Sequence, residues 1–413
     1  MPPTVTVYLL TGDVGGTNSR MSLYDTASSI PLAVKYYRNQ EALTDKSDGA
    51  FESKIISPFL QFCWETVKHL VPIEEAEIIS CLACAGPVRD NKVHMSNLGI
   101  NIDGTAIEKN IFSEEIYIRK INRALIINDF VAQGYGCLTL DDTEVKELTP
   151  GSHKMIDCNG PKVCVGAGTG LGECYLTPNG NGSYGCFPSE GGHVEYNPRS
   201  DLEIKLRSYL MNKFGNKHRI STERVVSGMG LANVYEFLAA EFPDQVDKAV
   251  HDEFLSAGDM QGKVVSVNAK DGSLCKQALE IMISAYGSEV GSAAVKWIPT
   301  GGLFVTGGLT PKNIQHIEGQ DSGFMKAFLD KGRVSPVLST IPLFAVMVED
   351  LGVRGAHKAC LMEYERMTKS EPKAAPTTAI SSSPPSSFLA VAALATTAAL
   401  AMATGFLLAK KRA

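Results

Sequence analysis

A glycine-rich turn near the N-terminus brings a carboxylate and a hydroxyl together where both could meet a phosphate group. The stretch Gly12–Asn18 reads GDVGGTN and directly follows an apolar run. Gly15 and Gly16 let backbone amides approach phosphate oxygens closely, and Thr17 can donate a further hydrogen bond. Asp13 can hold a magnesium ion directly or through water. The chain contains no GxxxxGK[ST] loop, and a plain tight hairpin is the alternative interpretation of this turn.

A second glycine-rich turn occurs far downstream. Gly166–Gly172 reads GAGTGLG and again follows an apolar run. Its Gly168, Thr169 and Gly170 combine small and hydroxyl residues as the first turn does, so they can also cradle phosphate. Two such turns so far apart predict two lobes that hold a triphosphate from opposite sides, which is the arrangement of the actin, Hsp70 and sugar-kinase superfamily. Each turn taken alone could equally be an ordinary hairpin.

Between the two turns, an apolar run ends in an amide and a carboxylate. Ile126–Phe130 reads IINDF, so Asn128 and Asp129 stand at the end of a predicted strand. A carboxylate placed there can accept the proton of a hydroxyl group as its oxygen attacks a γ-phosphoryl group, and the amide can orient a neighbouring hydroxyl. We therefore predict that Asp129 is a general base. The alternative is that Asp129 caps the following helix.

A loop after the second turn carries a carboxylate and an imidazole around two glycines. Pro188–Glu195 reads PSEGGHVE, with Glu190 and His193 at either end of the glycine pair. Such a loop can wrap a polyol, and each of the two side chains can bond vicinal hydroxyls, which is how a polar site distinguishes sugars. A surface pair or an incomplete metal site would explain the same two residues.

The alternation of apolar runs, glycine turns and helix-like stretches indicates an α/β protein. We expect a two-lobed actin-like ATPase fold of the ribonuclease H-like kind, with a cleft between the lobes. Residues 4–128 are predicted to form a small α/β lobe to which 350–366 returns, and residues 129–349 a large α/β lobe. The expected strands are Val5–Leu10, Ile78–Ala85, Ala124–Ile127, Lys162–Val165 and Leu303–Val305, and the expected helices are Ser53–Leu70, Ser200–Lys213, Gly230–Ala240 and Leu274–Lys296.

Bulk composition favours an intracellular protein with a small-molecule ligand. The 413 residues carry a formal net charge of -6, and Lys and Arg do not cluster before the last four residues, which argues against nucleic-acid binding. The ten cysteines are scattered, as expected of reduced thiols. The sequence does not open with a basic segment and a long apolar run, so a secretory signal is not expected.

The C-terminal stretch differs in composition from the rest. Residues 367–387 are rich in Pro, Ser and Ala, which predicts a flexible linker. Residues 388–409 contain no charged side chain and are long enough, as a helix, to cross a bilayer. A basic patch ends the chain. We therefore predict a transmembrane tail anchor that holds a cytosol-facing body on a membrane, and the alternative is an Ala-rich surface or disordered segment.

Taken in order, these segments resemble the bacterial-type glucokinase family over nearly all of residues 5–364. The two glycine turns resemble its phosphate turns, Ile127–Phe130 its catalytic segment and Glu190–His193 its sugar loop. Ser221–Gly228 is similar to the family segment that supplies a further sugar-binding glutamate, which falls on Glu223 here.

The resemblance extends to the nucleotide side and to one more sugar ligand. Gly302–Leu309 resembles the strand and turn beside the adenosine, so Gly307 and Gly308 would contact the nucleotide. Asn97 matches a sugar-loop asparagine of the family. The tryptophan that usually follows three residues later is Ile100 here, so the packing against the hexose, and with it hexose selectivity, stays open.

The resemblance implies a glucokinase, which transfers the γ-phosphoryl group of ATP, with Mg²⁺, to the 6-hydroxyl of glucose in the first step of glycolysis. It also implies a homodimer and, because residues 194–220 contain no cysteine, the absence of the zinc motif of the related ROK branch. The alternatives are a membrane-tethered sugar sensor without catalysis and a kinase for another hexose on the same fold. The glucose ligands implied are Asn97, Asn128, Asp129, Glu190, His193 and Glu223, with Asp129 as the base.

Overall fold

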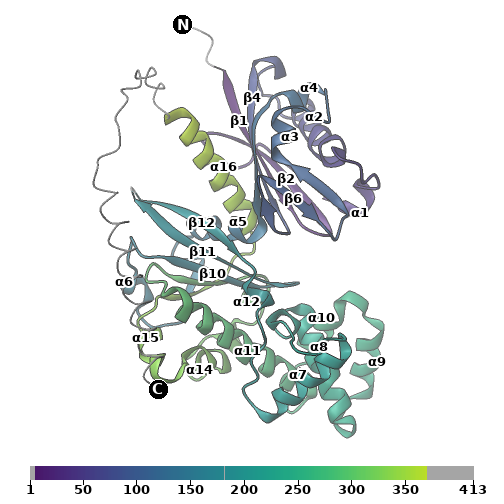
Figure 1. Ribbon diagram of the computed structural model, residues 1–413, viewed down its shortest axis with the longest axis vertical. Coiled ribbons are helices and arrows are strands. Elements are labelled where there is room, and N and C mark those ends of the chain that lie inside the picture. Colours follow the sequence, from purple (N-terminus) through teal and green to yellow (C-terminus); the bar gives the residue numbers. More distant parts are fainter. Residues whose placement is uncertain (1–4, 181, 370–413) are drawn as a thin grey trace, which may run out of the picture. The chain divides into compact units, whose positions relative to one another are not determined.

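Strands that carry the glycine turns belong to two mixed sheets, and a smaller sheet lies beside the first (Figure 1). The protein is seen in a computed structural model that describes residues 5–180 and 182–369. The strands are β1 (Thr6–Val14), β2 (Asn18–Asp25), β3 (Ala33–Arg38), β4 (Ala76–Cys84), β5 (Val88–Arg89), β6 (Lys92–Met95), β7 (Ile100–Asp103), β8 (Ile121–Asn128), β9 (Val145–Glu147), β10 (Lys162–Ala167), β11 (Leu171–Gly180), β12 (Ser183–Ser189), β13 (Leu303–Thr306) and β14 (Leu343–Val346).

Both large sheets have the same core topology. The strand order is β3-β2-β1-β4-β8 in the first sheet and β12-β11-β10-β13-β14-β9 in the second. In the first sheet β1 pairs with β2 in antiparallel orientation and with β4 in parallel orientation. In the second sheet β10 pairs in the same way with β11 and β13. The ribonuclease H-like arrangement expected from the sequence therefore occurs twice, once for each glycine turn.

Helices cover both sheets, and short helical turns mark several loops. The α-helices are α1 (Asn39–Ala42), α2 (Ser57–Thr66), α3 (Gly104–Glu108), α4 (Ile116–Arg119), α5 (Asp129–Cys137), α6 (Ser152–Met155), α7 (Asp201–Lys213), α8 (Gly228–Glu241), α9 (Lys248–Ser256), α10 (Gln261–Val267), α11 (Leu274–Trp297), α12 (Leu309–Lys312), α13 (Ile314–Ile317), α14 (Gly323–Leu329), α15 (Ser335–Leu338) and α16 (Leu351–Lys369). A π-helical turn spans Glu52–Ile56, and 3₁₀ turns span Ile73–Glu75, Gly191–His193, Thr222–Arg224, Pro243–Gln245, Gly258–Met260 and Gly332–Val334.

The first sheet is buried on both faces because the residues of its central strands alternate between two apolar layers. Leu10 and Ile78 belong to the core on one face. Leu9 and Ile79 point to the opposite face, where they join the apolar cluster that includes Cys360 of α16. Figure 1 shows α16 running along this sheet, so the last described helix completes the lobe that the N-terminal strands begin.

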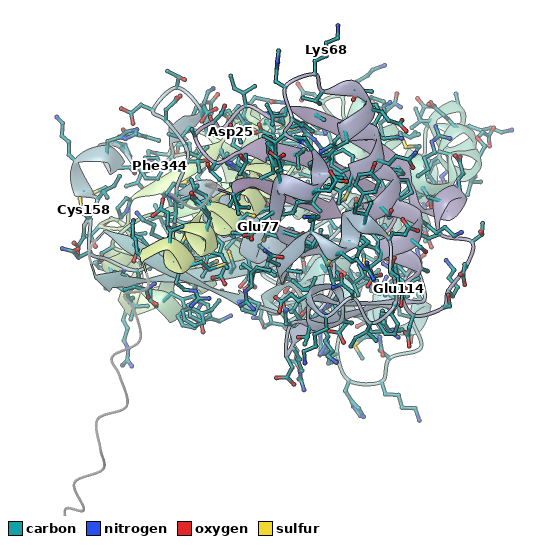
Figure 2. The ribbon with its side chains drawn as sticks, turned by 90° about the horizontal axis from the view of Figure 1, so that it is seen from above. Asp25, Lys68, Glu77, Glu114, Cys158 and Phe344 are labelled. Atoms are coloured by element: carbon teal, nitrogen blue, oxygen red, sulfur yellow. The ribbon has the colours of Figure 1, made fainter. Side chains whose placement is uncertain are left out.

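The second sheet has the same two-faced packing. Val165 of β10 and Tyr286 of α11 are buried in the core on one face of this sheet. The next residue back, Cys164, belongs to the other face and packs in a cluster with Cys174 of β11 and Cys137 of α5. Asp25, Lys68 and Glu114, which are labelled in Figure 2, are examples of exposed charged residues.

Helices α5 and α16 touch backbone to backbone where they cross. A Cβ placed on Gly355 of α16 would lie 1.6 Å from the carbonyl oxygen of Ala132 of α5. A Cβ on Gly136 of α5 would lie 2.3 Å from the carbonyl oxygen of Leu351. Only glycine permits such an approach at these two positions. The crossing fixes the start of α5, which carries Asn128 and Asp129, against the helix that covers the first sheet.

The predicted membrane anchor must be corrected. Among the residues that the structure describes, no helix combines the length and the apolar character needed to cross a bilayer. The proposed span, 388–409, and nearly all of the predicted linker, 367–387, lie outside the described residues. Nine of its 22 residues are Ala and three are Thr, and both favour insertion only weakly, so its lack of charge was too weak a criterion. The transmembrane helix is therefore withdrawn from the fold, and membrane anchoring and the cytosol-facing placement from the localisation.

Candidate active site

The first glycine turn is the hairpin between β1 and β2. The backbone amide of Gly15 donates a hydrogen bond to the carbonyl of Asn18 at 3.0 Å, which closes the turn. Thr17 and Asn18 are exposed, whereas Asp13 is partly buried and pairs across the strands with Arg20. The side chains expected to meet phosphate therefore face solvent, and the carboxylate expected to meet magnesium sits deeper.

A buried asparagine that the sequence did not single out holds this turn. Asn39 is 0% exposed; its Oδ1 accepts a hydrogen bond from Ser19 Oγ at 2.7 Å, and its Nδ2 donates to the carbonyl of Gly15 at 2.8 Å. The backbone amide of Asn39 also donates to the carbonyl of Thr17 at 2.8 Å. One residue thus fixes both ends of the turn. An Asn in a polar stretch gives no signal of this role, because only the tertiary fold brings it there.

Asp13 lies where a magnesium ligand could stand. Burial raises the pKa of this carboxyl group, and the nearby Arg20 guanidinium acts in the opposite direction. A Cβ on Gly352 would lie 3.4 Å from Asp13 Oδ2, so the carboxylate borders the first turn of α16, where a helix dipole favours negative charge. Magnesium at phosphoryl-transfer sites is commonly held by one or two carboxylates together with substrate phosphates. A single recessed carboxylate beside a phosphate turn fits that donor set.

Asn128 and Asp129 stand at the start of α5. The sequence left open whether Asp129 caps this helix or acts as a general base. Asn128 is the capping residue: its Oδ1 accepts from the backbone amides of Phe130 at 2.9 Å and Val131 at 3.2 Å. Its Nδ2 donates to the carbonyl of Gly86 at 3.1 Å. Asp129 is the first residue of the helix and accepts a 3.0 Å hydrogen bond from the Phe130 amide. The side chain of Asn128 therefore caps α5, and the second carboxylate oxygen of Asp129 stays available for chemistry.

The environment of Asp129 suits a base that is neutral in acid and charged near neutral pH. Burial raises the pKa of this carboxyl group to about 6, against the lowering effect of the Phe130 amide. The negative charges of Asp13 and Glu190 raise it further. Three of the predicted site residues, from β1, α5 and the sugar loop, thus lie close enough to influence one another electrostatically. A pKa in this range is typical of catalytic carboxylates.

Phe130 anchors this segment to the second sheet, and the sequence did not indicate it. A Cβ on Gly172 would lie 2.0 Å from the Phe130 ring, and a Cβ on Gly166 would lie 3.0 Å from it. The ring therefore packs on the backbone of β10 and β11, the strands that flank the second glycine turn. These two glycines serve ring packing, while the predicted phosphate contacts belong to the residues between them.

The second glycine turn is closed by its own backbone and braced from outside. The amide of Gly168 donates to the carbonyl of Gly170 at 2.8 Å, and the amide of Gly228, at the start of α8, donates to the carbonyl of Gly168 at 2.8 Å. The amide of Leu171 donates to Glu223 Oε2 at 3.0 Å. Thr169, at the tip, is exposed. Glu223, which the sequence predicts at the sugar, therefore contacts the second glycine turn.

The predicted adenosine turn adjoins the second glycine turn. Gly307 follows β13 with a φ of +80°, and a Cβ there would lie 2.3 Å from the carbonyl oxygen of Ala167. Both the backbone conformation and the close approach require glycine. Gly308 borders the ion pair of Lys312 and Glu349, whose charged atoms are 3.4 Å apart. The two turns therefore form one continuous glycine-lined edge.

The sugar loop packs its glycines inward and leaves its polar side chains in solvent. Glu190 Oε2 and His193 Nε2 are 3.9 Å apart, and their side chains are 64% and 55% exposed. Gly191 and Gly192 are buried, and a Cβ on Gly192 would lie 1.9 Å from the carbonyl oxygen of Leu171. The loop is thus seated on β11 just after the second glycine turn, with its two polar side chains open to a ligand.

Asn97 lies beside the first glycine turn. A Cβ on Gly16 would lie 3.4 Å from Asn97 Nδ2, and the asparagine itself is exposed. Ile100, which replaces the tryptophan usual in the family, is 1% exposed and belongs to the core of the first lobe. Position 100 therefore packs inward here, so the departure from the family pattern leaves Asn97 without an aromatic neighbour three residues on.

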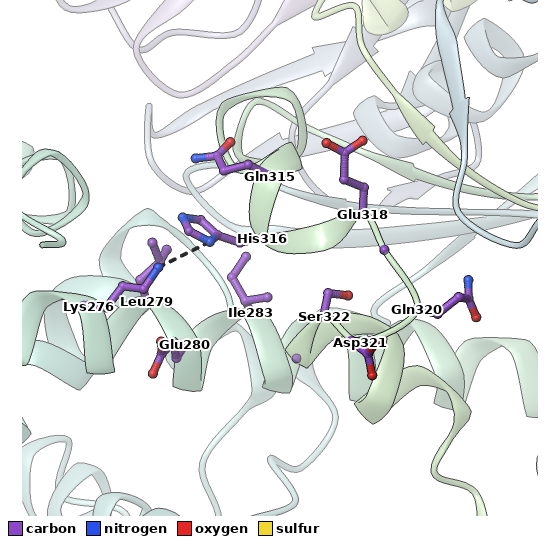
Figure 3. Close-up of a pocket in the computed structure, with 12 residues that line it drawn as sticks. Lys276, Leu279, Glu280, Ile283, Gln315, His316, Glu318, Gln320, Asp321 and Ser322 are labelled. Carbon is purple, nitrogen blue, oxygen red and sulfur yellow. Dashed lines mark hydrogen bonds between the residues drawn. The ribbon is translucent and has the colours of Figure 1, made fainter. Parts of the chain in front are cut away.

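Two pockets lie away from these residues. One, of about 460 Å³, is formed by α11 and the segment from α13 to the start of α14, and Figure 3 shows Lys276 of α11 pointing at His316 of α13. The other, of about 500 Å³, is lined by residues that include Lys92 and Phe112. The predicted site residues line neither of the two. Their location follows from the glycine turns and the sugar loop, which lie at the exposed edges of strands.

Comparison with known proteins assigns the family. The glucokinase family profile matches residues 10–363. The chain belongs to the glucokinase family. A glucokinase of a Synechocystis strain is 37% identical over 364 residues, covering 85% of this chain and 97% of the relative. A glucokinase of Nostoc punctiforme is 36% identical over 361 residues, covering 84% and 97%. The resemblance drawn from the glycine turns, the IINDF segment and the sugar loop is thereby confirmed.

Solved structures agree on the fold of this glucokinase family member. The glucokinase of an Antarctic psychrotroph is similar with a TM-score of 0.61 and 25% identity, over 86% of this chain and 99% of that chain. The glucokinase of Balamuthia mandrillaris, solved in complex with glucose, has a TM-score of 0.66 and 18% identity, over 86% and 94%. The second comparison supports the fold alone. Together they confirm a two-lobed α/β sugar-kinase fold.

Proposed function

We propose that this chain is a glucokinase that transfers the γ-phosphoryl group of ATP to the 6-hydroxyl of glucose. The chain is an ATP-dependent hexose kinase by its family, and ATP is its co-substrate. One observation supports the residue-level proposal: Asp129 is a partly buried carboxyl group whose pKa is raised to about 6, and the charges of Asp13 on β1 and Glu190 of the sugar loop contribute to that rise. One carboxylate oxygen of Asp129 accepts from the Phe130 amide, and we propose that the other accepts the proton of the 6-hydroxyl.

In the proposed reaction, separate residues bind glucose, accept the proton and stand beside magnesium. Glucose is held by hydrogen bonds to Asn128, Glu190, His193 and Glu223, with Asn97 contributing from the edge of the first turn. The 6-hydroxyl gives its proton to Asp129 as its oxygen attacks the γ-phosphorus and the bond to the β-phosphate oxygen breaks. Magnesium, when bound with ATP beside Asp13, supplies positive charge that offsets the phosphate oxygens.

The nucleotide is proposed to lie across the two glycine turns. Backbone amides of the first turn, with Thr17 and Asn18, and those of the second turn, with Thr169, donate to phosphate oxygens, because such amides form anion-binding concavities. Gly307 and Gly308 provide a flat edge for the adenosine. Proximity and the exclusion of water on closure supply much of the rate.

Closure is proposed to occur between a lobe of residues 4–128 with 350–366 and a lobe of residues 129–349. The packing of α16 on the first sheet supports this division. The backbone contact between α16 and α5 is then a point where the two proposed lobes touch. The homodimer implied by the family resemblance stays a prediction, which gel filtration with light scattering tests.

A coupled assay that detects glucose 6-phosphate tests the function directly. The purified full chain is expected to turn over with glucose, ATP and Mg²⁺, and the Asp129→Asn variant to lose nearly all of this activity while still binding glucose. A panel of glucose, mannose, fructose and glucosamine ranks the hexoses by kcat/KM. A full chain that binds glucose but does not transfer phosphate would support the sensor alternative, and a higher kcat/KM for another hexose would correct the substrate.

A further inference from the structure

Two buried carboxyl groups face each other beneath the sugar loop. Glu173 of β11 is 3% exposed and Glu289 of α11 is 6% exposed. The two side chains lie within hydrogen-bonding range of each other, and each affects the ionisation of the other. Neither is part of the proposed ligand sets for sugar, phosphate or magnesium. Glu173 lies on the face of β11 opposite the face whose Cys174 packs in the cluster with Cys137 of α5, and Glu289 lies on α11.

The pair cannot be fully charged at neutral pH. Glu173 Oε1 and Glu289 Oε1 have no hydrogen-bond partner among the described residues. Lys296 Nζ is 3.6 Å from Glu289 Oε1, and its charge also acts to lower the pKa of Glu173. A single ammonium group cannot offset two negative charges. Two like charges in contact in a buried site keep one proton between them. A carboxylic acid that donates to a carboxylate satisfies both groups.

The surroundings of Glu173 and Glu289 also favour a protonated carboxyl group. Burial, then the negative charge of Glu289, raises the pKa of Glu173 to about 8, although the positive charge of Lys296 opposes the rise. Burial also raises the pKa of Glu289, although Lys296 and Lys331 oppose it.

Lys331, which follows α14, is expected to lose its positive charge in the same alkaline range in which Glu173 loses its proton. Burial and the nearby Arg199 lower the pKa of Lys331 to about 8, with Asp330 and Glu289 opposing. Tyr286 of α11 is the remaining ionisable neighbour of Glu173, and burial raises its pKa beyond the working range. As pH rises past neutrality, the site therefore gains a negative charge while it loses a positive one.

Glu173 is in direct contact with the loop that would hold glucose. A Cβ on Gly191 would lie 2.0 Å from Glu173 Oε2, so the carboxyl group packs on the backbone between Glu190 and His193. In the strand register Glu173 is opposite Ser189 of β12, whose Oγ accepts the amide of Gly191 at 3.0 Å. A change in the position of the carboxyl group must therefore move the loop backbone.

We propose that Glu173 and Glu289 are positioning residues whose shared proton seats the Glu190–His193 loop in the geometry that binds the sugar. The proposal rests on the proposed glucokinase function, which defines this loop as a sugar site. Glu173 acts through the backbone of Gly191 and touches no substrate. Loss of the shared proton separates the two carboxylates, displaces Gly191 and weakens the hydrogen bonds from Glu190 and His193 to sugar hydroxyls, while the nucleotide side is unaffected.

The test compares sugar and nucleotide affinity across pH in the full chain. For the wild-type protein, KM for glucose is expected to rise about five- to tenfold between about pH 7 and about pH 9.5, which corresponds to the loss of roughly one hydrogen bond. KM for ATP should change less than about twofold. In Glu173→Gln the amide donates to Glu289 without a titrating proton, so KM for glucose should match the wild-type value at neutral pH and stay flat in alkali.

Controls separate positioning from general destabilisation. Glu280 is exposed on α11, the helix that carries Glu289, and Glu280→Gln should keep the wild-type pH profile of KM for glucose. Glu173→Ala, which loses both shape and proton, should raise KM for glucose at every pH without a matching change in KM for ATP. Identical pH profiles for wild type and Glu173→Gln, or equal changes in both KM values, would overturn the proposal.

A direct binding measurement keeps this test distinct from that of the function. Calorimetric titration of glucose into the wild-type and Glu173→Gln proteins needs no turnover. Alkaline weakening of glucose binding in the wild type alone supports the loop proposal even if phosphoryl transfer fails. Normal turnover together with pH-independent glucose binding in the wild type rejects the loop proposal and leaves the function intact.

Discussion

The backbone amide of Leu171 donates a hydrogen bond to Glu223 Oε2 at 3.0 Å, so the second glycine turn rests on a proposed glucose ligand. A Cβ on Gly170 would lie 2.5 Å from the same oxygen. The carbonyl of Glu223 in turn accepts from Ser227 Oγ at 2.8 Å, and that hydroxyl caps α8. One carboxylate therefore joins the region proposed for phosphate to the region proposed for sugar.

Two substitutions at Glu223 should separate these roles. Glu223→Gln keeps an oxygen that accepts from the Leu171 amide but loses the charge that strengthens hydrogen bonds to sugar hydroxyls. It should raise KM for glucose by about tenfold and leave KM for ATP within about twofold. Glu223→Ala removes both contacts and should raise both KM values. Steady-state kinetics with each substrate varied in turn measures KM for glucose and KM for ATP separately. An unchanged KM for ATP in Glu223→Ala would count against a role of Glu223 in the second glycine turn.

Replacement of Asp129 by Asn should abolish the base while preserving the shape of the site. The Asn side chain can still accept from the Phe130 amide, so the start of α5 is retained. We expect kcat to fall by about 10²- to 10⁴-fold, the usual contribution of general base catalysis. Glucose binding, measured by calorimetry, should change little. A variant with more than about a tenth of wild-type turnover would remove Asp129 from the base role.

The pH dependence of the wild-type enzyme should report the same carboxyl group. Asp129 must be deprotonated to accept a proton, so kcat/KM for glucose should rise with pH through about 6, before the alkaline rise in KM proposed for the Glu173–Glu289 pair lowers it again. Its raised pKa also means that the folded state binds more protons than the unfolded chain between the ordinary Asp value and about 6, so stability falls over that interval as pH rises. Asp129→Asn should therefore be more stable than wild type at neutral pH and nearly equal to it in acid, as thermal unfolding at both pH values would show.

Asn39→Ala should loosen the first glycine turn. The change leaves Ser19 Oγ and the carbonyl of Gly15 without their buried partner, which costs about 1–3 kcal/mol of unfolding free energy for each group. KM for ATP should rise more than KM for glucose, because the turn is proposed to bind phosphate. Chemical denaturation and steady-state kinetics check the two effects. Asn39→Ala combined with Ser19→Ala removes one of the unsatisfied groups and should recover part of the stability; no recovery would show that Ser19 is not part of the brace.

Sequence patterns were sufficient for the elements that hold the site. Every expected strand and helix overlaps an observed element, because runs such as Ile78–Ala85 are buried on both faces and must be strands. The expected helix Ser53–Leu70 shows the limit of this reasoning. It is a π-helical turn followed by α2, which ends at Thr66, a break that periodicity does not reveal.

The residues that the sequence could not indicate act through tertiary contacts. Asn39 and Glu173 look like ordinary polar residues in the chain, and their roles arise only when the fold buries them against a glycine turn and a glycine loop. Phe130 could be read as one more apolar residue of a helix. The C-terminal prediction failed because it rested on the composition and length of residues 388–409 alone.

The last prediction concerns the crossing of α5 and α16. Gly→Ala in the middle of a helix normally stabilises it by about 1 kcal/mol, because alanine has the higher helix propensity. In Gly355→Ala, however, the added methyl group would stand 1.6 Å from the carbonyl oxygen of Ala132, so the two helices must move apart. We expect a net loss of unfolding free energy of at least about 2 kcal/mol.

Gly323→Ala is the matched control, because an added Cβ there meets nothing within 4 Å and its φ is not positive. That variant should keep or slightly gain stability in the same thermal unfolding experiment. Since α5 carries Asp129, Gly355→Ala should also lower kcat without a matching change in the apparent pKa of the kcat/KM profile. Equal stability of the two variants would mean that the helices at the crossing can separate without cost, and the backbone contact would then not be what sets the position of Asp129.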